Sequence, residues 1–386
     1  MYEVKTLNKI DKNGLGVLRE AGYGVSDGVE NPDAIMVRSA KMHDMVFGDR
    51  LVAIARAGAG VNNIPVNRCT EEGVVVFNTP GANAEAVKEL GVCALLMASR
   101  NVMGGIEWVK SISSQPDVAG AVEKGKSAFE GPEIGGKTLG VIGLGAVGVK
   151  MANAAVNMDM TVLGYNPHIT VDAAWKLNSK VQRVLDLDTV YKNSDYISLH
   201  VPYRESNHHM IDAAAIAKMK DGVRILNLAR AELVDDDAML AALESGKVAC
   251  YVTDFPNNKT AGAKNVVAFP HLGASTPESE EKCAIMAAEE LIGYLQDGTI
   301  RNSVNLPELS LKREGVCRLC VIHKDAPCMV NNFLDLIGAA GINVEHMANK
   351  ARGDYAYTII DTGSPVGDDI ARKIAAMADV KRVRVL

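Results

Sequence analysis

Residues 141–148 read VIGLGAVG, and Gly143, Gly145 and Gly148 form the pattern G-x-G-x-x-G. An apolar segment of strand character precedes the pattern, and a helix is predicted at residues 146–157 immediately after it. Glycines at these positions permit a tight turn, and the following helix presents unpaired N–H groups and a favourable dipole to a pyrophosphate. A glycine-rich turn that serves packing alone is the structural alternative. The stretch predicts a dinucleotide-binding βα unit, the start of a Rossmann-type sheet.

Apolar strands and helices alternate on both sides of this unit, which is the pattern of a parallel sheet with crossover helices. The first hundred residues repeat the alternation on a smaller scale. A long amphipathic segment at residues 277–296 predicts a helix that returns the chain to the first domain, so we expect that domain to be discontinuous. Strands are expected at residues 3–6, 34–37, 52–55, 74–78, 138–143, 161–165, 196–200, 223–228, 248–253 and 265–268, and further helices at residues 84–99, 213–219 and 235–245.

Composition and charge exclude several classes of protein. The 386 residues are 48% hydrophobic and 23% charged, an ordinary globular composition that is long enough for two or three domains. A net charge of −6 without a dense Lys/Arg stripe argues against a nucleic-acid partner. The first residues lack the features of a secretory signal, and the most apolar stretch, residues 139–149, is too short to span a bilayer. We therefore expect a cytoplasmic protein with neither a nucleic-acid nor a membrane partner.

Seven cysteines at irregular spacing are typical of free thiols in a reducing compartment. Cys317 and Cys320, with His323 close by, resemble a metal-binding group. Their segment alternates as a strand does, however, and residues three apart on a strand point to opposite faces. No second pair of ligands follows, so we expect no metal.

Arg230, Asp254 and His271 each follow a predicted strand of the large sheet, where open α/β sheets place their ligands. Reduction of a 2-keto acid requires a clamp for the carboxylate, a proton donor and a nicotinamide held face-on. The guanidinium of Arg230 can bind the carboxylate, and the imidazole of His271 can exchange a proton near neutral pH. Asp254 can hold the nicotinamide amide or its ribose. Taken singly, a surface ion pair, a helix cap and a structural His are the ordinary explanations of these residues.

The end of the second strand bears on the choice of cofactor. Asn166 stands 18 positions after Gly148, near the place where such folds usually have an Asp or Glu that binds the ribose hydroxyls. Asn can bond to the ribose, but it does not repel a 2′-phosphate. No Arg or Lys at residues 166–168 is available to hold that phosphate. NAD is therefore expected rather than NADP.

The order of motifs resembles that of the D-isomer-specific 2-hydroxyacid dehydrogenase family, and most closely its short D-3-phosphoglycerate dehydrogenases, which begin serine synthesis. The resemblance extends over essentially the whole chain. The motifs that carry it are ARAGAGVNNI at residues 55–64, NTPGANAEAVKEL at 78–90, the glycine loop, SDYISLHVP at 194–202, NLARAELVD at 227–235 and PHLGASTPESE at 270–280.

The resemblance implies an α/β architecture: a Rossmann-type, doubly wound NAD domain inserted in a smaller flavodoxin-like substrate domain, with a C-terminal βαββαβ domain of ACT type. Residues 1–99 and 279–305 would form the substrate domain, and residues 100–278 the NAD domain. Residues 306–315 would be a linker, and residues 316–386 the ACT-type regulatory or association domain. NAD as cofactor and a homodimer or tetramer are implied too, with the NAD domains providing much of the contact.

The resemblance also assigns roles to single residues. By motif match, Arg230 orients the substrate and His271 is the acid/base. Further substrate contacts are implied for the backbone turn of Gly58, Ala59 and Gly60 and for Arg38, Arg56 and Lys88, which are candidates for a phosphate or, equally, solvated cations. The residues implied to line NAD are Gly143, Gly145, Val147, Gly148, Asn166, Pro202, Ala229, Arg230, Ala231, Asp254, His271 and Gly273.

This sequence departs from the family within the site. The family has a Glu five residues after the Asp that matches Asp254, where it stabilises the protonated catalytic His, whereas this chain has Lys259. A nearby cation would lower the pKa of a His, which is the opposite effect. Ala231, in place of the usual Gly, is a smaller change.

The sequence is compatible with three functions. The leading prediction is NAD-dependent oxidation of 3-phosphoglycerate to 3-phosphohydroxypyruvate, because Arg230, His271 and Asp254 are all retained. An NAD(P)H-dependent reductase of hydroxypyruvate, glyoxylate or another 2-keto acid is the alternative enzyme. An NAD-responsive binding protein with weakened catalysis is the alternative of a different class.

The C-terminal segment HKDAPCMV, at residues 323–330, departs from the ACT pattern, in which a turn Asn-x-Pro-Gly binds an amino acid, often serine. Asp325 replaces the Asn, and Cys328 replaces the Gly with a side chain that disfavours the backbone geometry. His323, Asp325 and Asn343 are the candidate contacts for an amino-acid effector. We expect this domain to mediate association, and plain support of the fold is the alternative.

Overall fold

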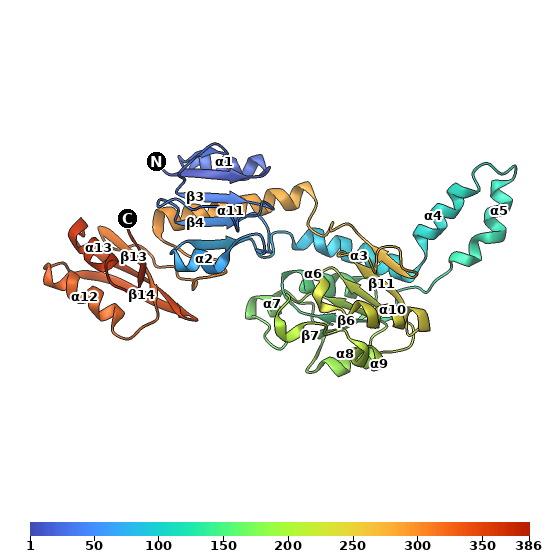
Figure 1. Ribbon diagram of the computed structural model, residues 1–386. Coiled ribbons are helices and arrows are strands. Elements are labelled where there is room, and N and C mark those ends of the chain that lie inside the picture. The colour runs from blue at the N-terminus through green and yellow to red at the C-terminus, as the bar shows by residue number, and fades with distance from the viewer. The chain divides into compact units, whose positions relative to one another are not determined.

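The computed structural model describes residues 1–386, and its contacts divide the chain into two compact units (Figure 1). Unit 1 contains residues 1–83 and 277–386, and unit 2 contains residues 84–276. The sequence interpretation placed these boundaries at 99/100 and 278/279. The difference at the first boundary arises from helix α3 (Ala84–Ser99), which packs against helix α6 (Ala146–Asn157) and the large sheet.

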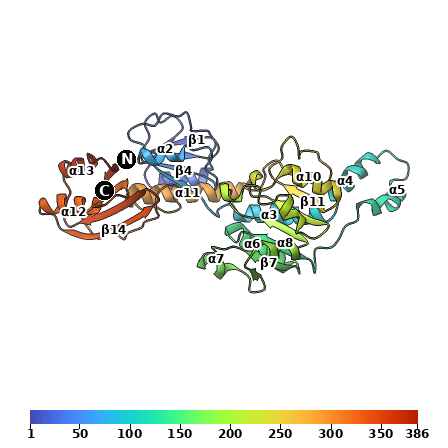
Figure 2. The same ribbon diagram turned by 60° about the horizontal axis from the view of Figure 1, so that its bottom comes forward.

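Unit 2 contains a seven-stranded parallel sheet, of which β7 and β11 are labelled in Figure 2. Its strand order is β12-β11-β10-β9-β6-β7-β8. Its two faces carry separate hydrophobic clusters. Val141 and Leu226 pack towards α3 and α6, whereas their neighbours Ile142 and Ile225 pack towards the helices of the other face. The strands are β6 (Thr138–Ile142), β7 (Thr161–Tyr165), β8 (Gln182–Val184), β9 (Tyr196–Leu199), β10 (Val223–Asn227), β11 (Val248–Thr253) and β12 (Val266–Ala268).

Burial on both faces explains why these strands are almost continuously apolar, and the predicted doubly wound sheet is confirmed. The short edge strand β8 was not predicted, because three residues leave no recognisable alternation. The helices that follow α6 are α7 (Val171–Lys176), α8 (Leu187–Asn193), α9 (Ala213–Ala217) and α10 (Asp236–Ser245).

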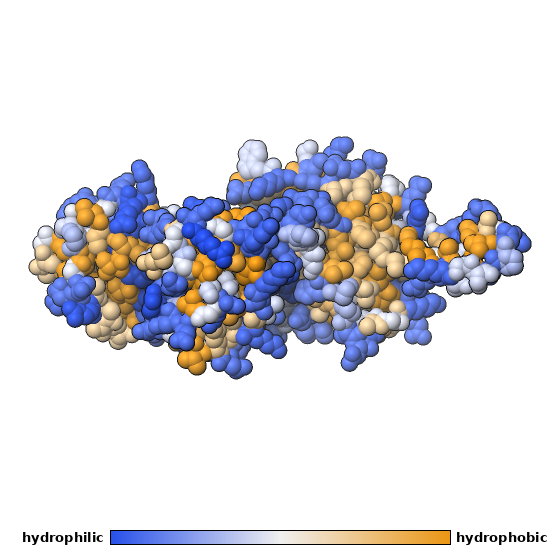
Figure 3. Space-filling view, turned by 90° about the horizontal axis from the view of Figure 1, so that it is seen from above, coloured by the Kyte–Doolittle hydropathy of each residue, from blue (hydrophilic) through white to orange (hydrophobic).

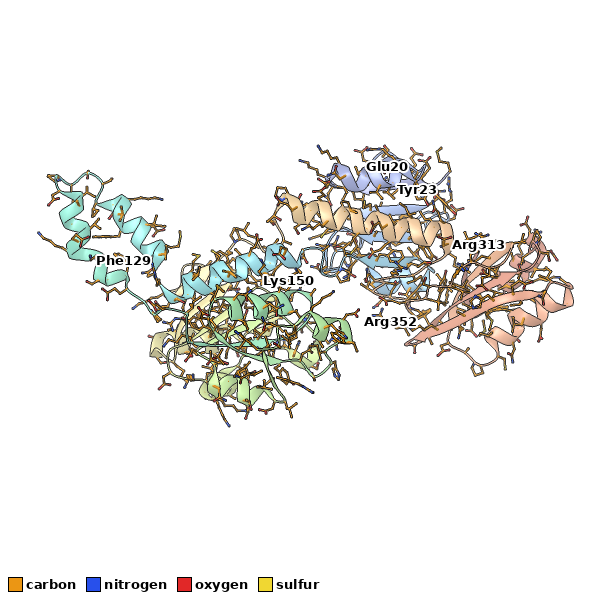
Figure 4. The ribbon with its side chains drawn as sticks, turned by 180° about the vertical axis from the view of Figure 1, so that it is seen from behind. Glu20, Tyr23, Phe129, Lys150, Arg313 and Arg352 are labelled. Carbon is orange, nitrogen blue, oxygen red and sulfur yellow. The ribbon has the colours of Figure 1, made fainter.

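A helical hairpin extends from the sheet of unit 2 (Figure 1). Helix α4 (Val102–Ser111) packs against α5 (Val118–Gly125) and the 3-10 turn η1 (Lys126–Phe129). The rings of Trp108 and Phe129, the latter labelled in Figure 4, have centroids 5.3 Å apart. Neither α4 nor α5 contains a buried residue. We refer to residues 102–129 as the arm.

Unit 1 contains a five-stranded parallel sheet with the order β2-β1-β3-β4-β5, as the alternation of the first hundred residues predicted. Helix α11 (Pro277–Asp297) packs on α1 (Lys12–Glu20) and on the sheet, so the chain does return to the first domain, as predicted (Figure 1). The close approach requires Gly14, because a β-carbon there would collide with the main chain of Ala284. The other elements are β1 (Glu3–Leu7), β2 (Gly24–Ser26), β3 (Ala34–Val37), β4 (Ala53–Arg56), α2 (Val66–Glu71) and β5 (Val75–Asn78).

The C-terminal residues form the predicted βαββαβ domain, a four-stranded antiparallel sheet with the order β14-β15-β13-β16. Leu319 and Val321 pack under the two helices of this domain. Cys320 and Ile322, on the opposite face of the same strand, share a hydrophobic cluster with Leu295 of α11. The elements are β13 (Cys317–Lys324), α12 (Met329–Ala339), β14 (Val344–Arg352), β15 (Tyr355–Thr362), α13 (Asp368–Ala375) and β16 (Val380–Val385).

Polar contacts reinforce this junction. Arg384 donates to the carbonyl oxygens of Tyr294 and Leu295, both at 2.8 Å, and Arg318 donates to that of Asp297 at 2.8 Å. These guanidinium groups therefore satisfy the free carbonyls at the negative end of the α11 dipole. Arg352, at the end of β14, donates to the carbonyl of Ser303 at 2.7 Å (Figure 4).

The predicted linker is tied to unit 1 by a bridge between Leu309 and Ile300. None of the helices in the structure combines the length and the apolar character that crossing a bilayer requires.

Candidate active site

The predicted site residues of unit 2 follow the strands of the large sheet at its carboxyl edge. His271 follows β12, Asp254 follows β11, Arg230 follows β10 and Pro202 follows β9. The glycine loop follows β6, and Asn166 follows β7. Because these strands are neighbours in that order, the groups are arrayed along one edge of the sheet. The strand order reverses at β6, and open α/β sheets bind their ligands at such a switch point.

The glycine loop has the backbone that close approach of a pyrophosphate requires. Gly143 has a φ of 96°, and a β-carbon there would meet the carbonyl oxygen of His200 at 2.6 Å. A β-carbon at Gly148 would collide with the carbonyl of Gly143. Gly145 begins helix α6 without a side-chain cap, and nothing lies within 4 Å of its missing β-carbon. The first-turn N–H groups, including that of Val147, are therefore free to bind an anion.

Polar groups at neighbouring strand ends suit the rest of a dinucleotide. Asn166 is half-buried at the end of β7, and its Oδ1 has only a long contact, 3.4 Å, with the N–H of His168. Pro202 is exposed, and its carbonyl accepts from Asn207 Nδ2 at 2.9 Å. His200, the residue after β9, has a structural role. Desolvation lowers the pKa of its imidazole to about 4, and its Nε2 bonds with Ser198 Oγ.

Arg230 projects from an extended residue that precedes the 3-10 turn η3 (Ala231–Leu233). Its side chain is exposed, and Nη1 donates to the carbonyl of Ala229 at 2.6 Å. No carboxylate of the protein pairs with the guanidinium. A free, always charged guanidinium at this edge can bind an incoming carboxylate through two parallel hydrogen bonds.

The loop of His271 is fixed by Asp254. Asp254 is buried, and its Oδ1 and Oδ2 accept from the N–H groups of Leu272 (2.7 Å) and Gly273 (2.8 Å). His271 itself has a φ of 56°, a conformation that is uncommon for a residue with a side chain. Both oxygens of Asp254 therefore bind the backbone of this loop.

Lys259 does not bind His271. Its Nζ donates to both carboxylate oxygens of Asp237 on α10, at 2.7 and 2.8 Å, and this contact raises the pKa of Lys259. The imidazole of His271 is exposed and packs against the ring of Phe255, with centroids 4.9 Å apart. No carboxylate of the protein bonds to this imidazole. The missing acid thus has no substitute within unit 2.

The predicted substrate turn in unit 1 is built around Arg56. Gly58 has a φ of 147°, and a β-carbon there would collide with the guanidinium of Arg56, whose Nε donates to the carbonyl of Arg38 at 3.1 Å. The carbonyl of Ala59 accepts from Asn78 Nδ2 at 2.5 Å. The structure therefore brings Arg56 together with the turn that continues through Gly60.

The other two predicted cations are engaged in ion pairs. Arg38 pairs with Glu280 of α11 at 2.7 Å. Lys88, in unit 2, pairs with Glu85, which also binds Lys150 at 2.8 Å (Figure 4). These two lysines lower the pKa of Glu85 to about 2, so Glu85 stays ionised and Lys88 keeps its partner at neutral pH.

The candidate effector residues of the C-terminal domain are not all available to a ligand. His323 is buried, its Nδ1 bonds with the carbonyl of Lys324 at 2.7 Å, and its Nε2 bonds with Thr358 Oγ1 at 2.8 Å. Asn343 donates to Glu345 Oε1, and the N–H of Asp325 donates to the carbonyl of Asp354. Cys328 does adopt the left-handed conformation, with a φ of 65°, that its position in the turn requires.

Two residues of the site were not found from the sequence. Asn227 holds the main chain of Arg230, and Phe255 contacts His271. Asn227 is the first residue of the quoted motif NLARAELVD and the last residue of β10, so an Asn near the end of a predicted strand was the available signal. Phe255 carried no signal, because an apolar residue after a strand is ordinary.

Comparisons with known proteins agree with this fold. Residues 92–273 match the family model described as "D-isomer specific 2-hydroxyacid dehydrogenase, NAD binding domain". The hydroxypyruvate reductase of Thermotoga maritima is 39% identical over 68% of this chain and 85% of its own length.

The D-3-phosphoglycerate dehydrogenase of Archaeoglobus fulgidus is 34% identical over 79% of this chain. The chain spans 58% of the length of that relative. Among solved structures, the NAD+-bound 3-phosphoglycerate dehydrogenase of Entamoeba histolytica has a TM-score of 0.62, with 24% identity over 80% of this chain and 99% of that one. This last likeness supports the fold.

Proposed function

Because the chain belongs to the D-isomer specific 2-hydroxyacid dehydrogenase family, we propose that it oxidises 3-phosphoglycerate to 3-phosphohydroxypyruvate with NAD, the first step of serine biosynthesis. One observation carries the proposal. The imidazole of His271, the guanidinium of Arg230 and an uncapped glycine loop lie along one edge of a single sheet, at strand ends in the order β12, β10, β6.

The reaction needs two groups of this chain besides the cofactor site. NAD, when bound, supplies the acceptor for the hydride of the substrate's 2-carbon. The guanidinium of Arg230 binds the substrate carboxylate and orients the adjacent carbon. A ring nitrogen of His271 takes the proton of the 2-hydroxyl group as the carbonyl forms. In the reverse direction, the same nitrogen returns the proton to the carbonyl oxygen.

No carboxylate of this chain bonds to the imidazole of His271, so the ring exchanges the proton of the 2-hydroxyl group without an orienting acid.

Support for a phosphorylated substrate comes from the similarity to a D-3-phosphoglycerate dehydrogenase. Arg38 and Lys88, two of the predicted phosphate contacts, are held by Glu280 and Glu85. These ion pairs, and the 39% identity to a hydroxypyruvate reductase, favour a second candidate function. It is the NAD(P)H-dependent reduction of hydroxypyruvate or glyoxylate.

An activity panel distinguishes these functions. Initial rates are measured with NAD and 3-phosphoglycerate or D-glycerate, and with NADH or NADPH and hydroxypyruvate or glyoxylate. We expect kcat/KM for 3-phosphoglycerate to exceed that for D-glycerate by at least about tenfold, the effect of one charged contact. Equal values, or turnover of hydroxypyruvate alone, would reject the phosphoglycerate proposal. NADH binding without turnover would instead support a binding protein.

We also propose a homodimer formed through unit 2. The arm and the end of α3 expose a run of apolar side chains that are 42–48% exposed, and Figure 3 shows hydrophobic atoms gathered along the arm and at its base. Contiguous exposed apolar surface of this kind marks an association site. The side chains are Leu96, Val102, Met103, Ile106 and Val109.

A further inference from the structure

The side chain of Asn227 binds the main chain of Arg230 through both of its polar atoms. Oδ1 accepts from the N–H groups of Ala229 (3.2 Å) and Arg230 (3.3 Å), and Nδ2 donates to the carbonyl of Arg230 at 2.8 Å. Nδ2 also lies 3.4 Å from the hydroxyl of Tyr251. Asn227 is completely buried, so water cannot replace these bonds. One amide group thus fixes the N–H and the C=O of the same residue.

Asn227 is also joined to the anchor of the His271 loop. Its carbonyl accepts from the N–H of Asp254 at 3.1 Å, and Asn227 pairs with Thr253, the residue before Asp254, across β10 and β11. Asp254 in turn holds Leu272 and Gly273. The loops of Arg230 and His271 are therefore attached to adjacent strand ends by two buried polar side chains, with one backbone hydrogen bond between the anchors.

We propose that Asn227 is a positioning residue for the reaction. It orients Arg230 towards the substrate and fixes the position of the Arg230 loop relative to the His271 loop. The inference rests on the proposed function, in which Arg230 binds the substrate carboxylate. Asn227 is completely buried, so it would act through Arg230 rather than by contact with the substrate or the cofactor. The amide is required because only a group with an acceptor and a donor side by side can bind the N–H and the C=O of one residue.

The expected effect follows from the geometry of the clamp. Without the amide, the N–H and C=O of Arg230 lose their buried partners, so the loop can leave the position that the amide fixes. A displacement of about 1 Å in a substrate-orienting group can cost on the order of 100-fold in rate. The glycine loop at β6 lies two strands away, and residues 229–231 supply only part of the predicted NAD contacts, so NAD binding should change much less.

Asn227→Ser tests this, because a serine hydroxyl is too short to reach both groups. We expect kcat/KM for the best substrate of the panel to fall by about 100-fold, mainly through KM, while the Kd for NADH changes less than threefold. Asn153→Ser is the matched control: Asn153 holds the 176–178 loop of the same unit by the same pair of bonds, donating to the carbonyl of Lys176 and accepting from the N–H of Asn178. Equal losses in both variants, or retention of activity within twofold by Asn227→Ser, would overturn the proposal.

Hydrogen exchange gives a readout that does not depend on turnover. In the full-length protein, Asn227→Ser should accelerate exchange in the peptide that contains Ala229 and Arg230 at least tenfold, while β6 keeps its protection. Unchanged exchange in this peptide would show that the clamp does not hold the loop. If the wild-type protein has no activity on any 2-hydroxy or 2-keto acid, the proposed function fails, whereas the exchange experiment still decides whether Asn227 orders Arg230.

Asn227→Asp adds a test by pH. Its carboxylate would face the carbonyl of Arg230 and repel it, but the protonated acid restores a donor at the same place. The only titratable group bonded to this amide is the hydroxyl of Tyr251, and burial raises its pKa, so it stays neutral. The activity of the variant relative to wild type should rise at least threefold as the pH falls from 8 to 5.5. A flat ratio would contradict the assigned donor role.

Discussion

Asp254 and Lys259 lie five residues apart, yet the structure gives them unrelated environments. Asp254 is buried and binds two N–H groups of the His271 loop, whereas Lys259 is exposed and bound to Asp237. The departure from the family at position 259 therefore removes an acid without placing a cation against the imidazole. The sequence identified the substitution, but the partner of Lys259 depends on how α10 packs, which no local pattern records.

Lys259→Glu tests this assignment. The new carboxylate would face Asp237 and its acidic neighbours Asp235 and Asp236 on the start of α10, so it should turn away from that helix. We expect kcat/KM to stay within about twofold of wild type, as it should in the control Lys259→Gln, because neither change reaches His271. An increase in activity with a shifted pH profile would show that residue 259 does approach the imidazole.

Glu290 on α11 predicts a dependence of stability on pH. It is buried, Oε1 accepts from Asn302 Nδ2 at 2.7 Å, and Oε2 has no partner. Burial raises the pKa of its carboxyl from 4.5 to about 8. Between pH 4.5 and about 8, the carboxyl of Glu290 is protonated in the folded state and ionised in the unfolded chain. The free energy of unfolding therefore falls as the pH rises through this range.

Glu290→Gln removes this titration. The melting temperature of the variant should rise relative to wild type between pH 5 and pH 9, with the largest gain at the highest pH. Thermal denaturation at several pH values measures the difference, and Glu289→Gln, at the neighbouring exposed position, is the control. A difference between Glu290→Gln and wild type that does not change with pH would contradict the raised pKa.

Arg230 and His271 could be proposed from residue type and position, because both follow strands of the large sheet at the edge where open α/β sheets place their ligands. Asn227 could not be assigned a role in the same way. Its function depends on a turn that brings the peptide of Arg230 back onto the side chain, and this turn is fixed by the packing of β10 against β11.

Among the elements, α11 connects the two sheets of unit 1. Its central residues cover the five-stranded sheet, and its last carbonyls bind Arg318 and Arg384 of the C-terminal domain. The helix was predicted from its amphipathic period, but its contact with the C-terminal sheet was not. Strand β13 is buried on both of its faces. From the sequence alone, this strand could not be distinguished from one that has a face in water.

The buried ion pair Arg318–Asp361 lies at this junction. Both side chains are fully buried, and Nε of Arg318 lies 2.6 Å from Oδ1 of Asp361. Arg318→Met leaves the charge of Asp361 buried without a partner, so we expect a loss of about 3–5 kcal/mol in the free energy of unfolding. The double variant Arg318→Met with Asp361→Leu should recover most of it. Denaturant unfolding of the three proteins measures both effects, and no loss in the single variant would show that water reaches the site.

For the whole molecule, the arm is the feature that the sequence left undescribed. Its helices bury nothing, so they lack the strong periodic pattern that identifies a packed helix. Because the apolar side chains of the arm are not buried within one copy, they support the proposed contact between two copies. The sheets, by contrast, were predictable because burial on both faces makes their strands nearly continuous in apolar residues.

Ile106→Glu tests the association. A charge in the centre of a subunit contact costs several kcal/mol, so the variant should elute as a monomer in size-exclusion chromatography with light scattering, at a concentration where wild type is a dimer. Trp175→Glu on α7, which replaces another exposed apolar residue of unit 2, should leave the dimer intact. A dimer that survives Ile106→Glu would place the contact elsewhere.

The most direct test of the account is a crystal structure of the protein with NADH and an unreactive 2-keto acid analogue such as oxamate. We predict that the guanidinium of Arg230 binds the analogue's carboxylate and that a ring nitrogen of His271 lies within about 2.6–3.2 Å of its 2-oxygen, beside the nicotinamide. A dinucleotide bound with residues 230 and 271 on opposite sides of it, or with either far from the nicotinamide, would contradict the proposed reaction.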